Sequence, residues 1–240
     1  MTALIMVIAV VAGMIQGVTD FGLGIILLCF FPYLFMLNKS AAFTNAITLC
    51  LAGIMCYQYR KSLGLSLIIL PTVFYLMGSS LSIYLAPMLP IIPLKIGFAI
   101  FLILLSIYFL GYSSKVNIKA TVLTMFICGF LSGICDGLFA IGGPMMVLFY
   151  LAVTSTQESY MASIQATFFI TGLYNLILRI HSGLLTVKML PLVCGGIIAI
   201  SLGLLLGNLL IKRLNVKLVR LATYLLIGCS GLLTLLTTIF

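Results

Sequence analysis

Acidic residues are nearly absent from this chain, whose 240 residues include only Asp20, Asp136 and Glu158. Charged residues of both signs make up 6% of the sequence, there is no tryptophan, and there is one histidine. Because about one-quarter of an ordinary soluble domain is charged, this composition excludes a soluble globular protein. With 64% hydrophobic residues and a mean hydropathy of +1.37, the sequence predicts a polytopic membrane protein.

The length of the apolar runs predicts how the chain crosses the membrane. Only α-helices and closed β-barrels satisfy every backbone polar group in lipid. The runs here are about 20 residues long, whereas barrel strands show alternating segments of about ten residues. We therefore predict an all-α fold.

Basic residues and cysteines exclude further classes. The net charge of +9 would suggest nucleic acid in a soluble protein, but most of these residues lie in short clusters between apolar runs, which is typical of loops at lipid headgroups. We expect membrane lipids as partners and no nucleic acid. The seven cysteines lie in apolar segments without a CxxC pair or a histidine cluster, so we expect packing residues, no metal and no cofactor.

The second half of the sequence repeats features of the first. Two glycines and an acid recur with the same spacing, since Gly13, Gly17 and Asp20 match Gly129, Gly133 and Asp136. After a gap of two residues, FGLG at 21–24 matches FAIG at 139–142. We predict two homologous repeats, at 1–112 and 120–240, joined by a loop at 113–119.

Each predicted repeat opens with an apolar segment that is too long for one straight span. These segments cover about 3–37 and 120–154, and a 35-residue helix would be roughly 52 Å long in a hydrocarbon core of roughly 30 Å. Both have a glycine-rich middle, which weakens a helix. We predict a broken helix or a hairpin in each, followed by three ordinary spans, at 41–59, 63–86 and 93–112 and at 160–180, 186–211 and 218–239.

The loop charges favour the hairpin. If each long segment crosses once, Lys and Arg divide evenly between the two sides of the membrane. If each returns to its starting side, one side has Arg60, Lys61, Lys115, Lys119, Lys212, Arg213, Lys217 and Arg220, and the other has Lys39, Lys95, Arg179 and Lys188. This second arrangement obeys the positive-inside rule. Three spans then follow each hairpin, so the repeats would be inverted.

Asp20 and Asp136 each lie in a glycine-rich break. Such a break exposes free backbone N–H groups at a helix start, which favour an anion. The acid can cap these groups, or it can bind a proton, because low-dielectric surroundings disfavour its charged form. Protonation would remove its repulsion of an arriving anion. The two roles are compatible, and both acids are candidates for coupling or gating.

Other polar residues lie within predicted spans. Thr44 and Asn45 align with Ile164 and Gln165, so each half has an amide one helix after its break. These amides either form interhelical hydrogen bonds or contact a substrate or ion. Arg179 lies near the end of a span, where it either anchors the membrane interface or attracts anions if its segment faces a cavity.

Two stretches resemble a known family. GFLSGICDGLFAIGGPMMVLFYL, at 129–151, resembles the second-half signature of the sulfite exporter TauE/SafE family. GVTDFGLGIILLCFFPYL, at 17–34, is similar to its first-half signature, and AAFTNA, at 41–46, resembles the Ala-Thr-Asn element that follows. The resemblance covers nearly the whole chain. The chain departs from the family in having an Asp in both halves where a small or hydroxyl residue is expected, and IGGP where a third glycine is common.

The resemblance implies a transporter of the bacterial inner membrane that moves small sulfur-containing anions such as sulfite or organosulfonates. We expect the anion to contact the backbone at the two breaks and amides lining the cavity, at Gly22, Gly24, Thr44, Asn45, Gly142, Gly143 and Gln165. Asp20 and Asp136 would couple or gate transport to protons. No P-loop is present, so gradients or a separate ATPase would drive it.

Other readings stay open at this point. The chain could be a noncatalytic membrane assembly subunit, or a transporter of a cation or of another small anion, and a homodimer is an option. An intramembrane aspartyl protease also needs two acids, but the sequence lacks the Gly-x-Gly-Asp and Tyr-Asp settings of that group. We therefore expect no enzymatic activity.

Overall fold

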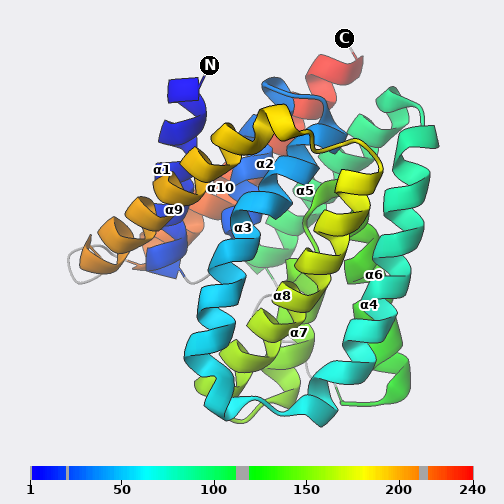
Figure 1. The fold of residues 1–240 in the computed structure, drawn as a ribbon, viewed down its shortest axis with the longest axis vertical. Helices are drawn as coiled ribbons and strands as arrows, with labels where there is room; N and C mark the ends of the chain where they lie inside the picture. Colours follow the sequence, from blue (N-terminus) through cyan, green and yellow to red (C-terminus); the bar gives the residue numbers. More distant parts are fainter. Residues whose placement is uncertain (1, 20–21, 112–118, 211–215, 240) are drawn as a thin grey trace. The chain divides into compact units, whose positions relative to one another are not determined.

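The computed structural model describes residues 2–19, 22–111, 119–210 and 216–239, and these residues form helices and short connections with no strand. Seven of the helices are long and apolar enough to cross a membrane. The prediction of an all-α polytopic membrane protein is confirmed. Figure 1 shows the helices, which are α1 (Thr2–Thr19), α2 (Leu23–Phe30), α3 (Leu37–Tyr59), α4 (Leu65–Leu85), α5 (Ile91–Gly111), α6 (Val122–Phe139), α7 (Gly143–Val153), α8 (Gln157–His181), α9 (Leu190–Leu210) and α10 (Val216–Ile239).

The two long apolar segments are both broken. The first divides into α1 and α2, and Gly22 before α2 has a φ of 95°, a left-handed conformation that glycine adopts without strain. The second divides into α6 and α7 at Ala140, which has a φ of 52°. α2 and α7 have 8 and 11 residues, and are therefore only about 12 Å and 16 Å long. Neither can span a bilayer.

The chain divides into two compact units that do not follow the predicted repeats. Unit 1 combines 1–40, 89–114 and 187–240, and unit 2 combines 41–88 and 115–186. Each unit therefore contains segments from both halves of the sequence. The repeat boundaries and the inversion stay predictions from the sequence.

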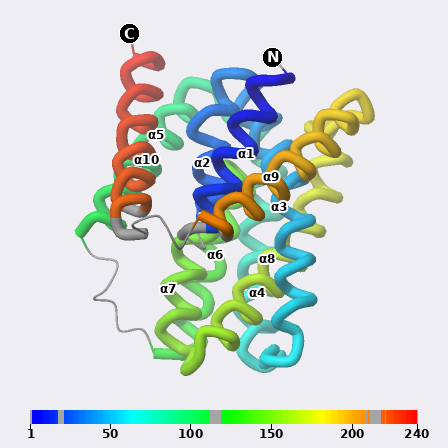
Figure 2. The backbone as a smooth tube through the Cα atoms, turned by 90° about the vertical axis from the view of Figure 1, so that its left-hand side faces the viewer, coloured from blue at the N-terminus to red at the C-terminus, as the bar shows by residue number. Residues whose placement is uncertain are grey.

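Within unit 1, α1 packs against α9 and α5 packs against α10 (Figure 2). The α1–α9 contact is close because small residues face backbone, with Gly13 against Ile200 and Gly203 against Val10. The Ser106 hydroxyl donates to the Tyr224 carbonyl at 2.7 Å between α5 and α10.

Within unit 2, the largest contact is between α4 and α6, which run in the same direction because successive residues of α6 face successive residues of α4. A Cβ at Gly129 would meet the Pro71 carbonyl, one at Gly133 would meet the Tyr75 carbonyl, and one at Gly137 would meet Ser79 and Ser82. Three glycines spaced by four thus allow the two backbones to approach closely, as small residues do in membrane helix pairs. An apolar cluster of Tyr75, Cys128, Met146, Phe149, Tyr150 and Ile164 fills the unit beside this contact.

The helices α6 and α7 form a hairpin. The end of α6 lies beside the end of α8, because Asn175 and Arg179 bond to Asp136. The middle of α7 lies beside the middle of α8, because Tyr150 bonds to Thr167. Since only three residues separate the end of α7 from the start of α8, α7 must run back toward the end of unit 2 where α6 begins, as Figure 1 shows. Of the two options from the sequence, the hairpin is the one found here.

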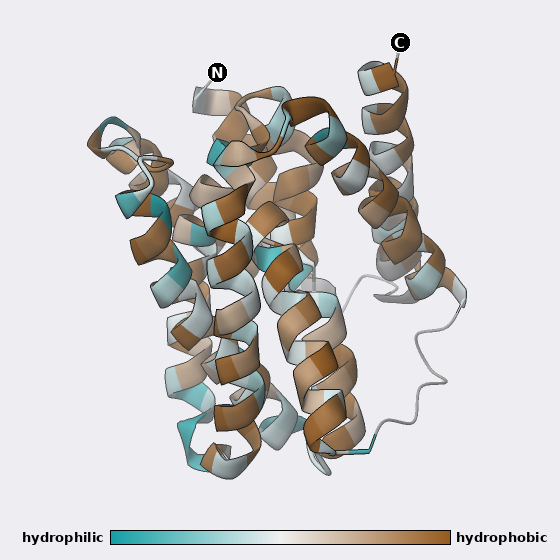
Figure 3. Cartoon of the chain, turned by 90° about the vertical axis from the view of Figure 1, so that its right-hand side faces the viewer, coloured by the Kyte–Doolittle hydropathy of each residue, from teal (hydrophilic) through white to brown (hydrophobic). Residues whose placement is uncertain are grey.

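Hydrophobic residues occupy much of the length of the helices (Figure 3). Large hydrophobic residues from nearly every long helix are exposed, among them Leu81, Leu104, Ile198, Leu209 and Leu232. Such surfaces are expected where helices face lipid. Polar groups inside the units are therefore the features that need a functional explanation.

Candidate functional site

Asp136 lies in the last turn of α6, at the break of the hairpin in unit 2, and is 9% exposed. The helix ends there because Ala140 turns into a left-handed conformation and donates its N–H to the Asp136 carbonyl at 2.7 Å. Gly142, Gly143 and Pro144 then begin α7, where proline fits because the first helical N–H groups need no helical partner. The sequence thus places a carboxylate next to the free N–H groups of a new helix.

Three hydrogen-bond donors surround the Asp136 carboxylate. The amide Nδ2 of Asn175, on α8, donates to its Oδ2. The Tyr75 hydroxyl, on α4, and the Gly142 backbone N–H also bond to it. Gly142 has no room for a side chain, because a Cβ there would collide with the Tyr75 hydroxyl. The Asp136 carboxylate therefore bonds to the backbone N–H just before α7, and side chains from two further helices hold it in place.

Arg179 is the second charged group at the break and is 1% exposed. Its Nη2 donates to the carbonyl oxygens of Asp136 at 2.6 Å and Gly137 at 3.0 Å. A guanidinium at the C-terminal end of α6 gives these carbonyls a further donor and complements the helix dipole. The interpretation of Arg179 as an anchor at the membrane interface is wrong, since the side chain lies inside unit 2.

Asp136 and Arg179 are the only buried charged residues in the part of the chain that the structure describes. Glu158, the third acid, is exposed at the start of α8. Placing a charge in an apolar interior is costly unless an opposite charge or several hydrogen bonds compensate it. The site thus contains one positive and one negative group that depend on each other.

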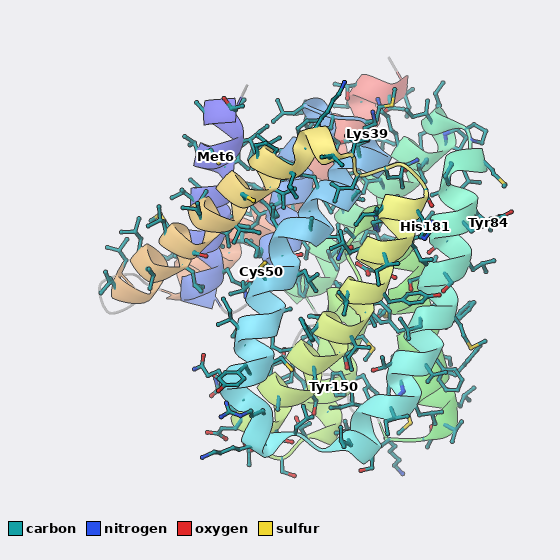
Figure 4. The ribbon with its side chains drawn as sticks, viewed as in Figure 1. Met6, Lys39, Cys50, Tyr84, Tyr150 and His181 are labelled. Atoms are coloured by element: carbon teal, nitrogen blue, oxygen red, sulfur yellow. The ribbon has the colours of Figure 1, made fainter. Side chains whose placement is uncertain are left out.

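A polar stripe along α8 leads from this site toward the opposite end of unit 2. Every fourth residue is polar and buried, namely Ser163, Thr167, Thr171, Asn175 and Arg179. Thr167 bonds to the Tyr150 hydroxyl at 2.6 Å and to Thr72 at 3.4 Å. Figure 4 shows Tyr150 beside the first half of α8 and His181 at the end of this helix. Four steps of four residues cover about 24 Å, most of a bilayer core.

Several buried polar atoms in unit 2 have no hydrogen-bond partner among the described residues. They are Thr44 Oγ1, Asn45 Oδ1, Ser132 Oγ, Ser163 Oγ, Asn175 Oδ1 and Arg179 Nε. Buried polar atoms are rarely left unpaired, because each unpaired group costs free energy. Water or a ligand would complete them.

The structure places the residues expected from the sequence in different units. Thr44, Asn45, Asp136, Gly142, Gly143, Gln165 and Arg179 belong to unit 2, whereas Gly22 and Gly24 belong to unit 1. Asp20 lies outside the described residues. Asn45 donates from Nδ2 to the Gly172 carbonyl at 3.4 Å, which is an interhelical hydrogen bond. The structure brings Asp136, Gly142 and Arg179 together.

Two residues of the site were not predicted from the sequence. Tyr75 and Asn175 both bond to the Asp136 carboxylate. For Asn175 a signal was available, because polar residues recur every fourth position from 163 to 179 and would share one helix face. Tyr75 had no comparable signal, since it is one of eleven tyrosines in the chain.

The family described as Sulfite exporter TauE/SafE matches residues 5–234. The chain belongs to the TauE/SafE family. Its members are membrane transporters, which agrees with the multi-pass helical fold of both units and with the resemblance noted from the sequence. No curated protein and no solved structure matched the chain. In this TauE/SafE protein, the site at the hairpin break contains the two buried charged residues among those described and lies at one end of the polar stripe of α8.

Proposed function

We propose that this TauE/SafE protein is a secondary transporter that moves a small sulfur-containing anion, such as sulfite or an organosulfonate, across the cell inner membrane. The family description names sulfite. The observation that carries the proposal is the set of donors at the hairpin break, where an amide, a hydroxyl and a backbone N–H bond to a single carboxylate and a buried guanidinium bonds to the backbone beside it. The same donors suit a sulfite or sulfonate group.

Protons are the coupling ion in this proposal. Asp136 is an acid within an apolar unit, and its protonation would leave Arg179 as the one charged group at the site. The site would then attract an anion. Asp20 matches Asp136 in the repeat and would act in the same way in the first half of the chain. A proton and an anion that load together give a carrier driven by the pH gradient.

Transport by purified protein in liposomes tests this function. We expect uptake of sulfite, and of sulfoacetate or thiosulfate if the site is general for sulfur anions, to increase when a pH gradient is imposed. Asp136→Asn should remove the response to the gradient. Ser80→Ala is the matched control, because Ser80 bonds to the Tyr174 hydroxyl on the exposed side of the α4–α8 contact. Absence of uptake for every sulfur anion would contradict the proposal. If a cation, and no anion, raises the thermal stability of the purified protein, the site would be a cation site instead.

A further inference from the structure

The carboxylate of Asp136 occupies a site that is suited to an external anion. Its three partners, Asn175 Nδ2, the Tyr75 hydroxyl and the Gly142 N–H, all act as donors toward it. They come from α8, α4 and the turn before α7, so they enclose the carboxylate from three elements. A sulfonate or sulfite oxygen needs the same kind of donors as a carboxylate oxygen.

Arg179 has a hydrogen-bond donor, Nε, that is not used within the described residues. The Nη2 atom of Arg179 donates to two backbone carbonyls, while Nε is buried without a partner among the described residues. A guanidinium has five N–H groups in a planar fork and pairs with oxyanions through two of them at once. An anion beside Asp136 would supply the acceptor that Nε lacks.

The charges at the site limit which anion fits. Arg179 and an ionised Asp136 sum to zero, and no other charged residue among those described is buried. A singly charged anion that enters together with a proton on Asp136 keeps this sum at zero. A doubly charged anion would leave one negative charge uncompensated in an apolar interior, which is strongly unfavourable.

We propose that the donors of Tyr75, Asn175, Gly142 and Arg179 form a binding site for a singly charged oxyanion, and that the Asp136 carboxylate is its built-in occupant. The anion enters when Asp136 takes up a proton and releases the donors, so the empty site blocks itself with its own carboxylate. This inference rests on the proposed transport function and adds to it a substrate class and a mechanism of exchange.

Few other groups near Asp136 can titrate. Tyr75 faces it from α4, Cys135 lies beside it on α6, and Arg179 faces it from α8. The tyrosine of α7 nearest the stripe, Tyr150, bonds to Thr167 instead. Arg179 stays charged at any pH used for transport. Asp136 is therefore the group through which pH acts on the site.

Binding of two anions with fixed charge tests the inference. Methanesulfonate carries one negative charge and sulfate two across the assay range, so any pH dependence belongs to the protein. We expect calorimetry on the purified full chain to give a Kd for methanesulfonate at least about tenfold lower than for sulfate at low pH. On the alkaline side of the Asp136 titration, the Kd should rise by up to about tenfold per pH unit, because one proton binds with each anion.

Variants separate the internal occupant from the donors. Asp136→Asn lacks the negative charge at every pH, so its Kd for methanesulfonate should not change with pH. Tyr75→Phe removes one donor and should raise the Kd by roughly tenfold, as expected for a hydrogen bond to a charged group, while keeping the pH dependence. Ser80→Ala should match the wild-type protein in both respects.

The outcomes distinguish this inference from the transport function. Equal affinity for methanesulfonate and sulfate, or a pH-independent Kd in the wild-type protein, would overturn the inference while sulfite uptake could still stand. If Asp136→Asn does not fold, the inference is tested by the wild-type protein alone, through its preference for methanesulfonate over sulfate and the pH dependence of its Kd. A wild-type protein that transports no sulfur anion would overturn the transport function and this inference with it.

Discussion

At the scale of residues, the buried charges depend on each other. Arg179 bonds to the backbone at the end of α6, and the Asp136 carboxylate beside it bonds to three donors. Neither residue is exposed enough to be compensated by solvent. Removing one partner leaves the other as an unpaired charge in an apolar interior, whereas removing both leaves only neutral groups.

A double-mutant cycle follows from this dependence. Arg179→Met should lower the free energy of unfolding by about 3 to 5 kcal/mol, and less at low pH, where a proton neutralises the carboxylate. Asp136→Asn added to Arg179→Met should recover part of the loss, because the unpaired charge is gone. Unfolding in detergent at two pH values is measured for the wild-type protein, the two single variants and the double variant. Additive effects of the two substitutions would show that the charges are not coupled.

At the scale of elements, the sequence predicted the helices better than their pairing. The six ordinary spans and both breaks were predictable, because apolar length and glycine content are local properties. The acid at the second break was also found, since Asp136 is one of three acids in the chain. The contact of α8 with α6, which makes Arg179 a buried residue, depends on packing between distant segments and has no local signal.

The α4–α6 contact positions the site and should tolerate little change. Gly133 faces the Tyr75 carbonyl, and Asp136 follows it by one turn, so the close approach brings the Tyr75 hydroxyl to the carboxylate. Gly133→Ala would force the backbones apart. We expect it to destabilise the protein by about 1 to 3 kcal/mol and to weaken anion binding.

Gly97→Ala is the matched control for this substitution. Gly97 lies within α5 and has open space where a Cβ would be placed, and alanine favours a helix more than glycine does. We expect it to leave stability unchanged or slightly increased. Thermal unfolding followed by circular dichroism compares the two variants, and an equal effect would show that the α4–α6 contact is not tightly packed.

At the scale of the whole molecule, the burial of Arg179 strengthens the predicted topology. Arg179 was counted as a loop charge on the side with fewer basic residues, but it lies inside unit 2. That side then keeps only Lys39, Lys95 and Lys188. Within unit 2 the same asymmetry holds, because the exposed Arg60, Lys61 and Lys119 lie at the end where α4 and α6 begin. The turns at 86–90 and 182–186, at the opposite end, contain no Lys or Arg.

This asymmetry predicts that the turn at 60–64 faces the cytoplasm and the turn at 182–186 faces the outside. Ser62 and Ser182 are exposed at these two turns. In a background without native cysteines, Ser62→Cys should react with a membrane-impermeant maleimide only in inverted vesicles, and Ser182→Cys only in intact cells. The opposite pattern would reverse the orientation of the hairpin. The start of α6 and the end of α7 both lie at the end of unit 2 that carries Arg60. The expected labelling would therefore place these two helix ends on the cytoplasmic side. The break with Asp136 would then lie at the other end of the hairpin, away from the cytoplasm.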